Sequence, residues 1–140
     1  MNVQMGMTMA EATSVRVNSP SYQAYQILHI AFTVAPIVAG IDKFLHFLVN
    51  WDQYLSPIVP RTLGISAHSF MLGAGVIEVI AGLLVAIAPR IGGWVVGLWL
   101  CGIIVNLLTI PAHLDIALRD LGLALGAFAL ARLSVDYSEV

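Results

Sequence analysis

The segment AHSFMLGAGVIEVIAGLLVAIA, residues 67–88, is apolar over the length of a membrane span and carries one carboxylate, Glu78, at its middle. A helix of about 20 apolar residues crosses the hydrocarbon of a bilayer. A charged side chain at that depth costs about 3 kcal/mol or more, so such residues are rare and are usually paired or functional. The segment therefore predicts a transmembrane helix with a polar group that faces protein.

The same combination of an apolar stretch and an embedded polar group occurs three more times. Residues 25–49, 91–110 and 115–133 each have the length of a spanning helix. Only helices and closed barrels satisfy the backbone in lipid, and the alternating pattern of a barrel strand is absent. The chain is 59% hydrophobic and 10% charged, whereas soluble domains are about 25% charged. We therefore expect an all-α polytopic membrane protein, an up-and-down bundle of four transmembrane helices.

This pattern predicts one domain with two short tails. The transmembrane domain covers residues 22–134, between a polar N-terminal tail, 1–21, and a C-terminal tail, 135–140. The N-terminal tail lacks the basic start and short apolar core of a signal peptide, so we expect a surface tail.

The distribution of charge bears on orientation and on partners. The side of the membrane that holds both termini also carries Arg16, Arg90 and Arg132, so the positive-inside rule favours termini in the cytoplasm. The net charge of −2 provides no basic surface for a polyanion. We expect the lipid bilayer as a partner and no nucleic acid.

Polar residues of all four stretches fall at similar depth. At about 1.5 Å per residue, Glu78 lies near the midplane, and the others lie in the middle or toward one surface. One such residue could be accidental, but a set spread over four helices predicts a site. This set, the polar seam, consists of Asp42, Lys43, Glu78, Asn106, Arg119 and Asp120.

Helical spacing places the seam residues on faces that also carry glycine. Glu78 shares a face with Gly75 and Gly82, and Arg119 shares a stripe with Gly122. Glycine permits close approach of helices in lipid, so the polar groups are expected to point at neighbouring helices. The glycine pairs predict packing within the chain, with a dimer or partner-subunit face as the alternative.

The charges of the seam nearly balance, which leaves two interpretations. Lys43 and Arg119 can face Asp42, Glu78 and Asp120 in a buried network that fixes helix register. Alternatively, Glu78 is left protonatable at the midplane and marks a path for protons or substrate. The near balance favours the structural network.

Three histidines lie near one surface, on or beside different helices: His46, His68 and His113. They could ligate haem, or a metal with Asp52 or Asp115, but no short ligand spacing supports either site. We therefore expect no metal site and no intrinsic cofactor. Together with Lys43 and Glu78, the histidines are candidate ligand-binding residues. Cys101 is the only cysteine and is expected to be a small packing residue.

Three motifs in this order are similar to those of a known family. Gly40-Ile-Asp-Lys43-Phe44, Gly75-Val-Ile-Glu78 and Arg119-Asp120-Leu121 resemble the DoxX-like family of bacterial membrane proteins, over about residues 25–133. The resemblance implies a four-helix protein of the bacterial cytoplasmic (inner) membrane. It also implies that the recurring polar residues are Lys43, Glu78 and Asp120.

The resemblance further implies a redox-linked setting. Some relatives are the membrane subunit of a thiosulfate:quinone oxidoreductase, and others are associated with thiol and oxidative-stress enzymes. A single cysteine and the lack of a cofactor motif argue against catalysis by this chain alone, so no catalytic residue is expected. We expect a non-catalytic accessory subunit of a larger membrane complex, with other membrane subunits or a homo-oligomer as partners. The alternative is a subunit that binds quinone or lipid through Glu78, Lys43 or a histidine.

Overall fold

The computed structural model describes residues 8–11 and 17–139, and this part of the chain is helical, without strands. The all-α class is therefore confirmed for the described residues. The predicted N-terminal tail falls largely on residues 1–7 and 12–16, and these lie outside the described residues, as does Val140 of the C-terminal tail.

Four long helices make up most of the structure, and short helical turns occupy the connections. The loop 46–66, between the first two long helices, contains two of these turns. The long helices are α2 (Pro20–Leu45), α4 (Ala67–Ile87), α5 (Pro89–Leu108) and α6 (Leu114–Tyr137), and the short ones are η2 (Trp51–Tyr54), α3 (Ile58–Leu63) and η3 (Pro111–His113).

Local signals fix most of the helix ends. The Ser19 hydroxyl caps α2 by accepting the Tyr22 N–H, and the Ser66 hydroxyl caps α4 by accepting the Ser69 N–H. Pro89 opens α5, at a position where its missing N–H costs nothing. The first predicted span, 25–49, is displaced. α2 begins at Pro20, after the Ser19 cap, and ends at Leu45, because His46 adopts the left-handed conformation.

Among the described residues, three helices are long and apolar enough to cross a membrane: α2, α4 and α5. The fourth predicted span, which corresponds to α6, is not one of them. α6 has 24 residues, but its apolar length is interrupted by five charged residues: Asp115, Arg119, Asp120, Arg132 and Asp136.

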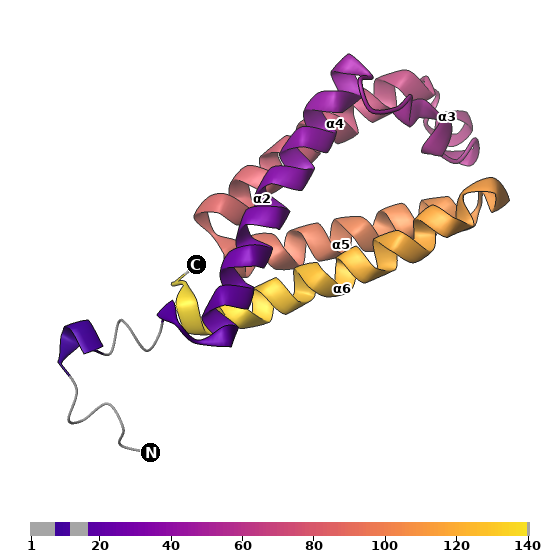
Figure 1. The fold of residues 1–140 in the computed structure, drawn as a ribbon. Coiled ribbons are helices and arrows are strands. Elements are labelled where there is room, and N and C mark those ends of the chain that lie inside the picture. Colours follow the sequence, from indigo (N-terminus) through magenta and orange to yellow (C-terminus); the bar gives the residue numbers. More distant parts are fainter. Residues whose placement is uncertain (1–7, 12–16, 140) are drawn as a thin grey trace.

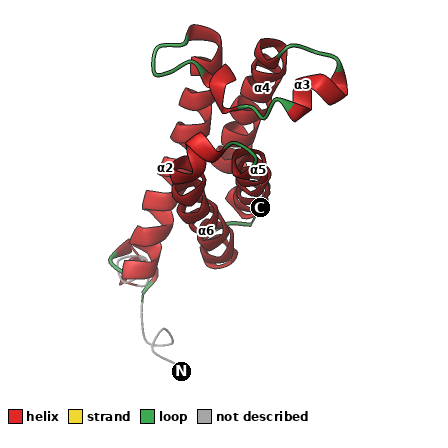
Figure 2. Ribbon diagram, turned by 90° about the vertical axis from the view of Figure 1, so that its right-hand side faces the viewer, coloured by secondary structure: helices red, strands yellow, loops and turns green. Residues whose placement is uncertain are grey.

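The long helices form two pairs that diverge from one end. Figure 1 shows α2 beside α4 and α5 beside α6, joined where α4 turns into α5, with α3 at the wide end. The same pairs, and the loop 46–66 beyond them, can be followed in Figure 2. The four helices therefore pack together closely at the narrow end only.

Each end of the molecule has its own apolar core. At the wide end, Leu55 from the loop packs on Met71 and Ala74, next to Trp51 and Trp99. The loop thus supplies side chains where the helix pairs separate. At the narrow end, all four long helices contribute, through Tyr25, Phe32, Ala81, Val85, Val96, Ala127 and Leu130.

Glycines set the spacing within each pair. A Cβ on Gly40 of α2 would lie 2.5 Å from the Gly75 carbonyl oxygen of α4, and one on Gly93 of α5 would lie 2.8 Å from the Ala131 nitrogen of α6. These helices therefore touch through their backbones, as the glycine pattern predicted for packing within the chain. Gly122 differs, since a Cβ there would meet nothing within 4 Å.

Candidate functional site

The centre of the polar seam is an ion pair between α2 and α4. The Lys43 ammonium lies 2.9 Å from both carboxylate oxygens of Glu78. The two residues are buried, with 4% and 6% of their surfaces exposed. Removing one partner of such a pair leaves an uncompensated buried charge, so the pair links the two helices tightly.

Two tryptophans complete the surroundings of this ion pair. The Trp99 indole N–H of α5 donates to Glu78 Oε1 at 3.3 Å, and the Lys43 Nζ lies 4.0 Å from the centre of the Trp51 ring. The second contact is a cation–π interaction. Neither tryptophan is among the site residues predicted from the sequence. A signal existed for Trp99, which shares a helical stripe with Asn106.

Asp42, next to Lys43, fixes the end of α2. Its carboxylate accepts the backbone N–H groups of Phe47 and Leu48, at 2.9 and 3.1 Å, and the Trp51 indole N–H at 2.8 Å. Phe47, Leu48 and Trp51 all follow the helix in the chain, so their hydrogen bonds to Asp42 hold the chain folded back over the end of α2. His46 takes the left-handed conformation, with φ of 56°, at this reversal. Asp42 therefore positions the loop and, through Trp51, covers Lys43.

Replacing Asp42 by alanine is expected to loosen the loop without unfolding the helices. Each of these part-buried donors loses a hydrogen bond to a charged group, worth about 1.5–3 kcal/mol, so residues 46–56 should become more accessible. Chymotrypsin cleavage at Phe47, Trp51 and Tyr54 in detergent should accelerate at least tenfold. The matched control is Asp52→Ala, which removes only an exposed contact to His68 and should change cleavage little. Equal cleavage of both variants would show that Asp42 does not hold the loop.

Asn106 of α5 holds the other end of this loop segment. Its side-chain oxygen accepts the Ser56 N–H at 2.7 Å, and its side-chain NH₂ donates to the Tyr54 carbonyl at 2.5 Å. The structure thus separates Asn106 from the charged centre. Together, Asp42 and Asn106 attach the loop to both helix pairs.

Arg119 and Asp120 lie on α6. The guanidinium contacts Asp120 Oδ1 through Nε and Nη2, both at 3.2 Å. The side chain of Asp120 is 6% exposed and lies within electrostatic range of Lys43, whereas that of Arg119 is 63% exposed. Asp120 therefore faces the seam, and Arg119 lies at the surface of the molecule.

The three candidate histidines do not form one cluster. The rings of His46 and His68 stack with their centres 5.6 Å apart, and His68 Nδ1 lies 3.1 Å from Asp52 Oδ2. His113 instead packs edge-on against Tyr54, at 4.7 Å between ring centres. Within the described residues, no group of three or more His, Cys, Asp or Glu side chains could hold a metal ion.

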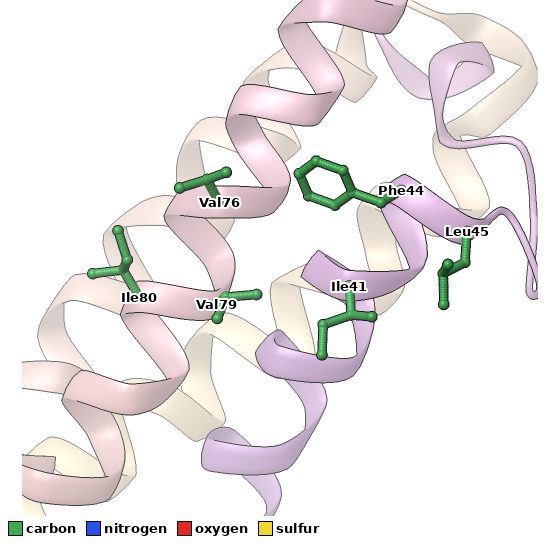
Figure 3. Close-up of a pocket in the computed structure, with 6 residues that line it drawn as sticks. All are labelled: Ile41, Phe44, Leu45, Val76, Val79 and Ile80. Atoms are coloured by element: carbon green, nitrogen blue, oxygen red, sulfur yellow. The ribbon is translucent and has the colours of Figure 1, made fainter.

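An apolar groove runs along the outside of the α2–α4 pair. Figure 3 shows the side chains of both helices that form its walls. The volume of the groove is about 310 Å³. This open, apolar surface is suited to contact with hydrocarbon. The lining residues are Ile41, Phe44, Leu45, Val76, Val79 and Ile80.

The chemistry of the seam follows from its partners. Lys43, Glu78, Asp42 and Asn106 each make hydrogen bonds or ion pairs to other parts of this chain. Groups held in this way stabilise a unique arrangement of helices and loop. The geometry is therefore that of a buried network joining α2, α4, α5 and the loop 46–66.

Comparison of the chain with protein-family models, with curated proteins and with solved structures finds no match. The DoxX-like resemblance thus remains a prediction from the three motifs.

Proposed function

We propose that this chain is a DoxX-like protein of the bacterial inner membrane and a non-catalytic accessory subunit of a larger, redox-linked membrane complex. The observation that carries the proposal is the Lys43–Glu78 pair, whose charges are satisfied by each other, by Trp51 and by Trp99. A lysine and a glutamate held in this way serve the architecture of the membrane domain. This use of the charged residues supports a scaffolding role over a reactive one.

The proposal includes four membrane crossings, with both termini in the cytoplasm. α2, α4 and α5 meet the requirements for spanning helices. α6 packs along α5 and, with 24 residues, is about 36 Å long. A helix that lies beside a spanning helix over such a length shares its depth, which supports α6 as the fourth span.

The outer surface supports docking within the membrane. The exposed residues of α5 are apolar or glycine, among them Leu98, Val105 and Leu108, at 59–65% exposure. Lipid or the apolar surface of another membrane subunit covers such faces. A small domain with a buried ion pair and an apolar exterior fits an accessory subunit.

Purification from the native membrane in a mild detergent tests this role. We expect the chain to migrate in a complex at least twice its own mass, with other subunits in fixed ratio. An isolated species without co-purifying subunits would contradict the proposal.

Organic extraction of the same preparation addresses the alternative role, which the groove of Figure 3 favours. One quinone per chain, with retention reduced by Glu78→Gln, would support ligand binding instead.

A further inference from the structure

The helix α2 ends before it reaches the level at which its neighbour α4 begins. A Cβ on Gly40 would lie within 3.0 Å of backbone atoms of Gly75 and Val79, so Gly40 is level with the midpoint between them. That midpoint lies ten residues from the start of α4 at Ala67, whereas only five residues of α2 remain to its end at Leu45. The difference of five residues places the end of α2 about 7 Å inside the end of α4.

The turn that follows α2 presents two large apolar side chains to its surroundings. Phe47 and Leu48 are 85% and 68% exposed. The exposed residues that flank them, His46 and Asn50, are polar. Two adjacent apolar side chains exposed to this extent would leave much hydrocarbon surface in water, which is unfavourable. The turn is therefore suited to an apolar environment.

The apolar surface of the turn continues the outer face of α2. Phe47 and Leu48 line an open groove together with Ile41 and Leu45, which Figure 3 shows on the last turns of α2. α2 is long and apolar enough to cross a membrane, so lipid is expected on its outer face. This face consists of exposed residues at spacings of three and four: Ile27, Ile30, Val34, Val38, Ile41 and Leu45.

The backbone of the turn does not depend on water for its hydrogen bonds. The His46 N–H donates to the Asp42 backbone carbonyl at 2.7 Å. The N–H groups of Phe47 and Leu48 donate to the Asp42 carboxylate at 2.9 and 3.1 Å. Non-helical backbone at membrane depth requires such partners from the protein, because lipid offers none. Asp42, which is 4% exposed, supplies them from inside the molecule.

The polar side of the turn points to the start of α4. The His46 ring stacks on that of His68, the second residue of α4, with 5.6 Å between the ring centres. His68 also contacts Asp52, and its side chain is 52% exposed. These polar groups fit the level of the lipid headgroups, whereas Phe47 and Leu48 lie toward the outer face of α2.

We propose that Phe47 and Leu48 form a membrane-inserted turn, whose side chains lie among the acyl chains of the bilayer and whose backbone is held by Asp42. α4 has 21 residues and is about 31 Å long, which matches a hydrocarbon thickness of about 30 Å. A turn about 7 Å inside the end of α4 lies within that thickness. The inference rests on the proposed crossing of the membrane by α2 and α4.

Nitroxide spin labels on single cysteines test the position of the turn. The full-length chain, with Cys101→Ser, is reconstituted in phosphatidylcholine vesicles and labelled at Phe47→Cys or Leu48→Cys. Oxygen concentrates in hydrocarbon, whereas a water-soluble nickel chelate is excluded from it. We expect both labels to collide with oxygen at least threefold more than with the chelate. Val38→Cys on the outer face of α2 should behave in the same way, and Gln53→Cys, exposed on the same loop, should show the reverse.

The role of Asp42 is tested in the Phe47→Cys background. Asp42→Ala should lower the ratio of oxygen to chelate collisions at least threefold, because the freed N–H groups require water. The matched control Asp52→Ala removes only the exposed contact to His68 and should leave the ratio unchanged. A Val38 label that keeps its lipid contact in the Asp42→Ala protein would show that α2 remains in place.

Three results would overturn the inference. Chelate collisions at Phe47 and Leu48 as frequent as at Gln53 would place the turn in water. Few collisions with either reagent would show that protein, such as a second copy of the chain, covers the turn. A ratio at Phe47 that does not respond to Asp42→Ala would show that Asp42 does not hold the turn in lipid.

The same measurements separate this inference from the proposed function. Chelate contact at the turn, with other subunits still co-purifying from the native membrane, would reject the inserted turn and keep the accessory role. Lipid contact at the turn, with no other subunit in the native preparation, would reject the accessory role and keep the inserted turn. Chelate contact at Val38 as well would reject the crossing of the membrane by α2, and the inserted turn with it.

Discussion

Lys43→Met is expected to destabilise the helical domain by about 3–5 kcal/mol, because it leaves the Glu78 carboxylate buried without its counter-charge. The ammonium contacts both oxygens of Glu78 at 2.9 Å, and the Trp99 N–H at 3.3 Å alone cannot replace it. Unfolding in mixed micelles with increasing SDS, followed by tryptophan fluorescence, measures the change in free energy. The SDS fraction at the midpoint of unfolding should fall, and little folded protein should remain even at low SDS.

The double variant Lys43→Met, Glu78→Met is the matched control. It removes both charges and keeps two long side chains at the contact of α2 and α4. Replacing a buried ion pair by apolar residues is often neutral or stabilising, so most of the lost stability should return. If the double variant were as unstable as Lys43→Met, the cost would come from packing around Lys43, and the pairing would not be its source.

Gly40→Ala is the second change with a large expected effect, about 1–3 kcal/mol or more. The new Cβ would lie 2.5 Å from the Gly75 carbonyl oxygen and 2.8 Å from a methyl carbon of Val79. A backbone oxygen in the middle of α4 cannot move aside, so α2 and α4 must separate. That separation also lengthens the contact between Lys43 and Glu78, one helical turn further along. The same SDS titration measures the loss.

Gly73→Ala in α4 controls for the intrinsic effect of the substitution. A Cβ at Gly73 meets nothing within 4 Å, and alanine favours a helix over glycine by about 1 kcal/mol. This variant should therefore be as stable as the parent or slightly more so. A Gly40→Ala protein that matched Gly73→Ala would show that the two helices do not touch through their backbones.

Features with a local cause could be predicted from the sequence. The ends of α4 follow from the Ser66 cap and from Pro89, and they lie within one residue of the predicted segment, 67–88. The face of α4 that meets α2 follows from the spacing of Gly75, Glu78 and Gly82. Periodicity along one helix contains this information because side chains three and four residues apart share a face.

The partners of the seam residues could not be predicted in the same way. Asp42 was expected to balance the charges, whereas it accepts N–H groups of Phe47 and Leu48 and the Trp51 indole. Asn106 was grouped with the charges, whereas it binds the loop at Tyr54 and Ser56. Both depend on the path of the loop 46–66, which has no helical period to reveal it.

The sequence by itself determined an all-α chain that is apolar enough for a membrane, and it predicted that the charges lie at a shared depth. Composition and periodicity suffice for this, because the cost of burying a charge or a free backbone group is the same in any topology. Only the tertiary structure decided that the helices diverge as two pairs and that Trp51 and Trp99 enclose the Lys43–Glu78 pair. These features depend on how distant segments pack against one another, and such packing produces no periodic pattern of residues in the sequence.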